Sequence, residues 1–239
     1  MLEILYQDEI CVAVNKPAGM LVHRTFLDHG ETVFVMQLLR DRLGCKVYPI
    51  HRIDKPTSGV LLFAIDPEQV KPLMQSFETG ETRKRYLAVV RGYLEGQGTI
   101  DYALKREVDD YTQAATAVEQ DAVTHYRMLS GVELPDAVGR YPTARYSLVE
   151  LRPETGRKHQ LRRHMAHLRH PIVGDTRHGD GAHNRYFRDR WQCARMLLHA
   201  SLLEFQHPIS CETISIQAPL PTDFQQVIES IGLYENPYI

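Results

Sequence analysis

Residues 51–59 read His-Arg-Ile-Asp-Lys-Pro-Thr-Ser-Gly, and the chain continues from there as Val-Leu-Leu-Phe-Ala-Ile. The apolar run that starts at Gly59 is short and bounded by turn residues, which predicts a buried central strand. Asp54 stands just before it, between basic residues. Nearby cations favour the ionised form of a carboxylate, and a rigid strand behind it fixes its position, as a nucleophilic or electrostatic carboxylate requires. The alternative is an ordinary turn in which Asp54 only bonds the backbone.

Patterns elsewhere predict the rest of the fold. Strands are expected at 10–14, 84–91, 122–130, 143–151, 197–205 and 212–217, and helices at 32–43, from Asp66 to about Phe77, and after Pro221. Strands outnumber helices and do not alternate strictly with them. We therefore predict an α+β fold with a mixed, mostly antiparallel central sheet flanked by helices. Residues 105–121 and 178–190 are expected to be loops.

The composition, 24% charged and 43% apolar over 239 residues, is that of a soluble globular protein. No stretch approaches the ~18 consecutive apolar residues of a membrane span, and the N-terminus lacks the basic region of a secretory signal. The four cysteines are scattered singly, which argues against a disulfide framework or a zinc knuckle. We expect a cytoplasmic protein.

The formal net charge of −2 is unevenly distributed. Residues 157–195 hold ten Lys and Arg against three acids, a net +7, together with six of the twelve histidines, whereas the rest of the chain carries −9. A basic stretch alone is more often a solvated face. Such a concentration of one sign in a mildly acidic protein, however, is what a polyanion site requires.

Within that stretch a helix is expected beyond Thr-Gly-Arg-Lys-His-Gln-Leu-Arg-Arg-His at 155–164. Leu161, Met165 and Leu168 fall at i, i+4 and i+7, so one helical face is apolar. The opposite face carries His159, Arg162, Arg163 and His167. This basic face and the amides at the start of the helix could meet phosphate.

The histidine spacing also allows a metal site, because His164, His167 and His170 lie three residues apart. There is no H-E-x-x-H pattern, however, and the surrounding Lys and Arg residues would repel a dication. We expect no metal.

A third motif, Lys-Arg-Tyr-Leu-Ala-Val-Val-Arg-Gly at 84–92, alternates as a strand and places Tyr86, Ala88 and Val90 on one face. Taken alone, Tyr86 is best interpreted as a core aromatic. As part of a site it could stack on a base, since every base presents a π-face.

Together these motifs resemble those of the RluA-type family of pseudouridine synthases. Asn-Lys-Pro-Ala-Gly at 15–19, and the stretches 51–59, 84–92 and 155–179, match the family motifs in order across most of the chain. The opening nine residues and the stretch 159–179 are most similar to the branch that modifies uridine 65 of transfer RNA. No S4-type RNA-binding domain is expected, and the region 105–121 is shorter than that branch suggests.

The resemblance implies one catalytic domain over residues 1–239, with two subdomains that share one sheet and a central RNA-binding cleft. It implies an isomerase that breaks the C1′–N1 bond of uridine and forms a C1′–C5 bond, without metal or organic cofactor. The expected partner is tRNA, with no membrane and no obligatory protein partner.

The resemblance also implies roles for residues. Asp54 would either attack the ribose or uracil covalently or assist a glycal-type elimination. Arg162 would pair with Asp54, and Tyr86 would lie against the uracil. Arg52 would replace the flipped-out nucleotide in the stem, and Leu198 would wall the base pocket. Further RNA contacts are expected from His51, Lys16, Arg157, Lys158, His159 and Gln160.

Three other interpretations remain open at this point. A metal-dependent nuclease is supported only by the histidines and lacks an acid cluster. A non-catalytic RNA-binding module explains the basic stretch but gives Asp54 no purpose among its cations. The same chemistry on ribosomal RNA would keep the enzyme and change the substrate.

Overall fold

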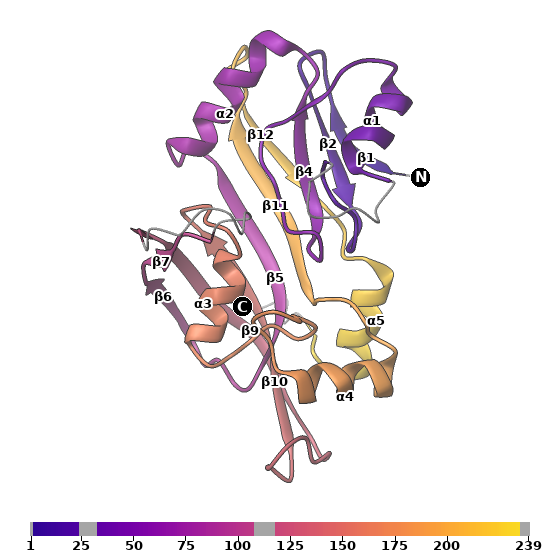
Figure 1. Cartoon of the computed structure of the whole chain (residues 1–239), viewed down its shortest axis with the longest axis vertical. Helices are drawn as coiled ribbons and strands as arrows, with labels where there is room; N and C mark the ends of the chain where they lie inside the picture. The colour runs from indigo at the N-terminus through magenta and orange to yellow at the C-terminus, as the bar shows by residue number, and fades with distance from the viewer. Residues whose placement is uncertain (1, 24–32, 108–117, 235–239) are drawn as a thin grey trace. The chain divides into compact units, whose positions relative to one another are not determined.

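The computed structural model describes residues 2–23, 33–107 and 118–234. The chain divides into two compact units, whose elements are labelled in Figure 1. The first unit comprises Met1–Lys84 and His199–Leu220, and the second Arg85–Leu198 and Pro221–Ile239. That the two act as one catalytic domain remains a prediction.

The first unit is built on strands in the order β1-β2-β4-β11. Its strands are β1 (Glu3–Gln7), β2 (Cys11–Lys16), β4 (Ser58–Ala64) and β11 (Leu198–Gln206), with β12 (Thr213–Gln217) paired to β11 and β3 (Tyr48–Pro49) paired to β4. All these pairs are antiparallel except β4 with β11, which is parallel. Every residue of β4 is buried, which confirms the expected central strand behind Asp54.

Helices α1 (Val35–Leu43) and α2 (Val70–Glu78) cover opposite faces of these strands. Helix α1 packs in a core with Val12 and Val14 of β2, whereas α2 packs in a core with Cys11 and Ala13 of the same strand. Alternate strand residues point to opposite faces, so both faces are covered. That double burial explains why β4 is apolar throughout rather than alternating. A 3₁₀ turn (Pro67–Gln69) precedes α2.

The second unit contains four antiparallel strands in the order β5-β10-β9-β6. They are β5 (Arg83–Arg91), β10 (Ala144–Pro153), β9 (Val123–Leu134) and β6 (Gln97–Asp101). Helix α3 (Gln160–His167) packs Leu161 and Met165 into a core with residues of β5 and β10, which confirms the expected apolar face. This unit also holds α5 (Thr222–Ser230) and the small pair β7 (Leu104–Lys105) and β8 (Glu119–Gln120).

The structure confirms the α+β class but corrects one expected loop. Residues 178–190 were expected to be a loop, yet most of them form helix α4 (Gly181–Trp191). The Asp180 side chain caps this helix by accepting from the amides of Ala182 and His183. Of the other expected loop, residues 108–117 lie outside the described residues. None of the helices in the described part of the chain is long and apolar enough to cross a membrane.

Candidate active site

The turn that carries Asp54 is tied to a second loop through backbone carbonyls. The Asp54 carbonyl accepts from the Thr57 amide at 2.9 Å, which closes the turn itself. The next carbonyl, that of Lys55, accepts from the Gly19 amide at 2.8 Å and from the Lys16 ammonium at 3.0 Å. Asp54 is half-buried in the first unit. Its position therefore depends on the Lys-Pro-Ala-Gly loop as well as on β4.

Lys16 is completely buried at the end of β2. Besides the Lys55 carbonyl, its ammonium bonds the carbonyls of Pro17 at 2.9 Å and Met20 at 2.7 Å. Three carbonyl acceptors match the three donors of an ammonium, so the buried charge is well compensated. We expected an RNA contact from Lys16, but this placement favours a role in holding the turn of Asp54.

The strand that follows the turn is fixed by its fit against β11. The Ser58 hydroxyl and the His199 Nδ1 lie 2.8 Å apart, and His199 Nε2 lies 3.2 Å from the Ala218 carbonyl. A carbonyl can only accept, so Nε2 donates to Ala218, and in a neutral ring Nδ1 then accepts from the Ser58 hydroxyl. A Cβ at Gly59, whose φ is +114°, would stand 2.1 Å from the carbonyl oxygen of Ala200. Only glycine allows this approach.

His51 lies at the start of the motif and bonds the backbone. Its Nε2 accepts from the Leu62 amide at 3.1 Å, and its ring stacks on Phe77 with centroids 4.8 Å apart. Burial, with a smaller effect from Lys84, lowers the pKa of His51 to about 3. A neutral imidazole that bonds β4 favours a structural role over the expected RNA contact. Arg52, by contrast, is exposed as its expected role requires.

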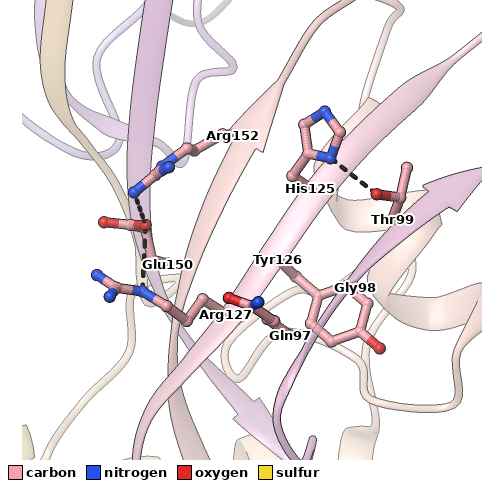
Figure 2. Close-up of a pocket in the computed structure, with 8 residues that line it drawn as sticks. All are labelled: Gln97, Gly98, Thr99, His125, Tyr126, Arg127, Glu150 and Arg152. Atoms are coloured by element: carbon pink, nitrogen blue, oxygen red, sulfur yellow. Dashed lines mark hydrogen bonds and ion pairs between the residues drawn. The ribbon is translucent and has the colours of Figure 1, made fainter. Parts of the chain in front are cut away.

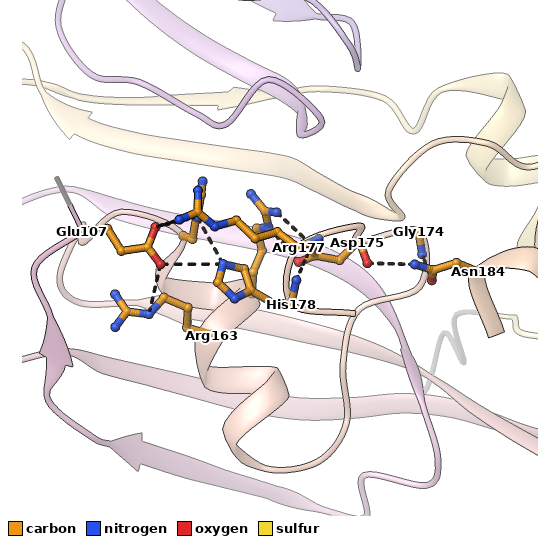
Figure 3. Close-up of polar contacts among 9 residues, drawn as sticks. Glu107, Arg163, Gly174, Asp175, Arg177, His178 and Asn184 are labelled. Carbon is orange, nitrogen blue, oxygen red and sulfur yellow. Dashed lines mark hydrogen bonds and ion pairs between the residues drawn. The ribbon is translucent and has the colours of Figure 1, made fainter. Parts of the chain in front are cut away.

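In the second unit, Asp175, which Figure 3 labels, forms a buried bidentate ion pair with Arg162 of α3. The Nε and Nη2 of Arg162 donate to the two carboxylate oxygens at 2.7 and 2.8 Å. Asp175 also accepts from the amides of Arg177 and His178. Burial alone would raise the pKa of Asp175, but the bonds from Arg162 and these amides outweigh it and lower the pKa. The carboxylate therefore stays ionised and fixes the guanidinium.

Sequence reasoning missed Asp175, although one of only three acids in so basic a stretch was a usable signal. It placed Arg162 on the exposed face of α3, but that side chain is only 6% exposed. The expected pairing of Arg162 with Asp54 joins residues of different units and remains a prediction.

The beginning of α3 is organised by Gln160, which is buried. Its side-chain oxygen accepts from the Thr155 hydroxyl at 2.7 Å and the Arg157 amide at 2.9 Å, and its nitrogen donates to the Val123 carbonyl at 2.9 Å. Gln160 thus shapes the loop before the helix rather than facing solvent. Arg157 donates through Nε to the Asp121 carbonyl at 3.0 Å, and Lys158 is half-buried.

Tyr86 and Leu198 belong to the apolar core beside α3. Leu198 is 2% exposed, and Tyr86 packs partly buried against the same group of side chains. Both positions suit side chains that line a pocket from its apolar side. Their contact with a base remains a prediction.

The histidines that suggested a metal site are engaged separately. His164 lies 2.9 Å from the Thr124 hydroxyl through Nδ1 and 3.1 Å from the Tyr102 carbonyl through Nε2. His167 stacks on Tyr102, and His170 lies 2.8 Å from the Arg91 carbonyl. A different group of potential ligands, Glu107, His159 and His178, comes together in the described part of the chain. The sequence did not indicate this group, because Glu107 lies far from both histidines along the chain.

A polar pocket of about 470 Å³ lies across β6, β9 and β10 (Figure 2). Its floor holds the Glu150 carboxylate, which is only 4% exposed and lies 2.6 Å from Arg152 and 3.6 Å from Arg127. Glu150 alternates along β10 with Val149 and Leu151, whose side chains face the core of α3. The pocket therefore opens on the opposite face of these strands. None of the residues expected to act on RNA lines it.

The chain is similar to several proteins of known type. The family model for RNA pseudouridylate synthase matches residues 10–167. A tRNA pseudouridine synthase C of Vibrio vulnificus is 55% identical over 232 residues, or 96% of this chain and 95% of that protein. The protein of the same name from Vibrio cholerae is 53% identical over 239 residues, or 99% and 98%. The solved structure of human RNA Pseudouridylate Synthase Domain Containing 4 matches with a TM-score of 0.72 at 26% identity, covering 97% of this chain and 94% of that one.

Proposed function

The chain belongs to the RNA pseudouridylate synthase family, and we propose that it isomerises a uridine of transfer RNA to pseudouridine with Asp54 as its catalytic carboxylate. The main support for this chemistry is the geometry of the turn that holds Asp54. Its backbone is held by the Lys55 carbonyl, which accepts from both Gly19 and Lys16. Relatives named tRNA pseudouridine synthase C support the choice of tRNA.

The reaction breaks the C1′–N1 bond and forms a C1′–C5 bond, while C5 loses a proton and N1 gains one. No electron is gained or lost overall, so acid–base and nucleophilic groups are sufficient and we propose no cofactor. The Asp54 carboxylate would bond covalently to the ribose or the uracil, or assist a glycal-type elimination. Either course needs an ionised carboxylate held in one place.

Arg162 would supply the positive charge beside Asp54. Its Nε and Nη2 contact Asp175, which fixes the direction of the guanidinium. Asp175 is then a positioning residue, which acts only through Arg162. Tyr86 would lie against the uracil and take part in removing the C5 proton, and Leu198 would wall the base.

The target uridine must leave its stack, because the glycosidic bond is inaccessible inside a helix. Arg52 is exposed beside the turn of Asp54, and we propose that it takes the place of the flipped-out nucleotide. Among tRNA uridines we propose position 65, at the foot of the acceptor and T stems. The net +7 of residues 157–195 suits the backbone of such a stem. We place the reaction in the cytoplasm.

Tritium release tests the chemistry and the class of RNA. The protein is incubated in EDTA with tRNA or ribosomal RNA that carries 5-tritiated uridine, because loss of the C5 proton frees the label. We expect release from tRNA by the wild type and by Asp41→Asn, which alters an exposed carboxylate in α1. Asp54→Asn should release none while binding tRNA with nearly the same affinity. Activity of Asp54→Asn above a few per cent would refute the assignment.

The position is tested by deleting the gene and mapping pseudouridine in cellular RNA by carbodiimide primer extension. We expect the loss of one modification, at position 65 of tRNA. Loss at a ribosomal site with position 65 intact would leave the chemistry standing and refute the substrate.

A further inference from the structure

One carboxylate lies inside the basic cluster beside α3. Glu107, just past β7, lies within ion-pair distance of two arginines and two histidines (Figure 3). Its oxygens lie 3.1 Å from Arg177 Nη2, 3.2 Å from His159 Nδ1, 3.9 Å from His178 Nε2 and 4.0 Å from Arg163 Nε. We call these four residues the cationic cluster. The proposed catalytic roles use none of its contacts with Glu107.

Most side chains of the cationic cluster are held in place by burial and hydrogen bonds. The side chains of Arg163, His159 and His178 are 12–18% exposed, so their directions are fixed, whereas Arg177 is 56% exposed and leaves one side open. Arg163 is also held by a bond from Nη1 to the Lys105 carbonyl at 2.9 Å. The amides of Arg177 and His178 are fixed through Asp175. Three of the four side chains around Glu107 are thus held in place.

Glu107 is held less firmly than the four residues that surround it. Glu107 Oε2 is buried, yet within the described residues it makes no hydrogen bond of good geometry. Its attraction to the cluster is therefore mainly electrostatic. A phosphodiester carries the same single negative charge on two free oxygens, and it could accept from the same donors with better geometry.

A metal ion fits this group less well. Glu107, His159 and His178 could supply three ligands, but the guanidinium groups of Arg163 and Arg177 lie within 4.0 Å of the same carboxylate. With both histidines neutral, these three charged groups sum to +1 before any ion arrives. A dication would meet net repulsion, whereas an anion would meet attraction.

We propose that the cationic cluster is a binding site for a backbone phosphate of the substrate RNA, and that Glu107 is an internal occupant which this phosphate displaces. That the ligand is RNA rests on the proposed function. Displacement costs binding energy for every RNA, so Glu107 weakens binding to any duplex that offers no other contacts. The same cost applies to every RNA, so removing the carboxylate should tighten binding of substrate and non-substrate RNA by a similar factor.

Removing the charge of the occupant tests the proposal. Glu107→Gln should bind tRNA, and a short non-substrate RNA duplex, about two- to fivefold more tightly, the effect of one partly exposed ion. Glu119→Gln is the matched control, because it removes an exposed carboxylate from β8, the strand paired with β7. Affinities are measured by fluorescence anisotropy at several salt concentrations. Equal affinities of Glu107→Gln and Glu119→Gln would overturn the proposal.

Arg177→Ala tests the cluster independently of Glu107. It should weaken RNA binding and lower the slope of log affinity against log salt by about one. Combined with Glu107→Gln, it should erase most of the gain. If Glu107→Gln proves unstable by thermal melting, RNA binding by Arg177→Ala still tests the proposal, because Arg177 is exposed. Unchanged affinity and salt slope in Arg177→Ala would overturn the proposal.

Two further outcomes separate this proposal from its neighbours. Stoichiometric zinc binding by the wild type that is lost in Glu107→Gln would identify a metal site and overturn the phosphate site. If tritium release fails while Glu107→Gln still binds the duplex more tightly, the proposed function falls and the phosphate site stands. If tritium is released from tRNA but Glu107→Gln shows no gain in RNA affinity, the proposed function stands and the phosphate site falls.

Discussion

Replacing Lys16 by methionine distinguishes a positioning role from an RNA contact. Methionine keeps most of the side-chain volume but removes the charge and the three bonds to the carbonyls of Pro17, Met20 and Lys55. Bonds to a charged group contribute about 1.5–3 kcal/mol each, or roughly 5–9 kcal/mol for three. The cost of burying an ammonium, several kcal/mol, offsets much of this sum.

The net loss of stability expected for Lys16→Met is therefore about 2–4 kcal/mol. The Lys55 carbonyl keeps its bond from the Gly19 amide, which limits the damage. In a chain of this size 1 kcal/mol corresponds to about 2–4 °C in Tm. Thermal melting followed by circular dichroism should thus show a decrease of roughly 4–16 °C. Lys71→Met, the same change at an exposed position in α2, should leave Tm nearly unchanged.

Kinetics below the melting range then separate the two roles of Lys16. If the ammonium positions the turn of Asp54, kcat for tritium release should decrease at least tenfold while affinity for tRNA and its salt slope stay the same. If Lys16 instead contacts phosphate, affinity should decrease and the slope should fall by about one. A normal Tm together with reduced affinity would refute our interpretation.

Three other predictions concern stability. Gly59→Ala should cost about 3 kcal/mol or more in urea unfolding, because its Cβ would stand 2.1 Å from the Ala200 carbonyl oxygen at a φ of +114°; a loss below ~1 kcal/mol would contradict this. His51, whose pKa burial lowers to about 3, should show no NMR titration between pH 5 and 8. Below about pH 6.5 only the unfolded state protonates His51, so this residue should lower stability by ~1.4 kcal/mol for each unit by which the pH falls. His51→Gln should reduce the pH dependence of stability by that amount. Arg162→Ala should cost about 3–5 kcal/mol, because it leaves the Asp175 carboxylate buried without its guanidinium; a smaller cost than for the double variant with Asp175→Ala would contradict this.

The sequence predicted those parts of the fold that depend on local patterns. The apolar run of β4 and the spacing of Leu161 and Met165 in α3 both follow from neighbours along the chain, and both were found. Helix α4 was missed because it buries only His183 and Phe187, so it has almost no apolar period. Its start at Asp180 and Gly181 also resembles a turn.

The roles of polar residues were harder to predict than the elements that carry them. Lys16, His51 and Gln160 were all expected to face RNA, because their side chains carry the right chemistry for it. In the structure each bonds a backbone group, the Lys55 carbonyl, the Leu62 amide and the Val123 carbonyl respectively, and their contacts with RNA stay a prediction. Those partners belong to other segments, and a residue type does not reveal which distant group its side chain will meet. Glu107 and Asp175 were missed for the same reason.

Hydrogen bonds from buried side chains to the backbone explain how a turn can hold a catalytic carboxylate in one place. A turn at the end of a strand has backbone groups without sheet partners, and water would satisfy them in many geometries. Buried side chains such as Lys16 satisfy them in only one. The polar residues that reach the backbone thus lower the freedom of the Asp54 turn. Arg162 and Asp175 stand in a similar relation, because a buried ion pair adds little net stability but fixes the direction of a guanidinium. Substitutions in either group should therefore reduce turnover more than they reduce affinity for RNA.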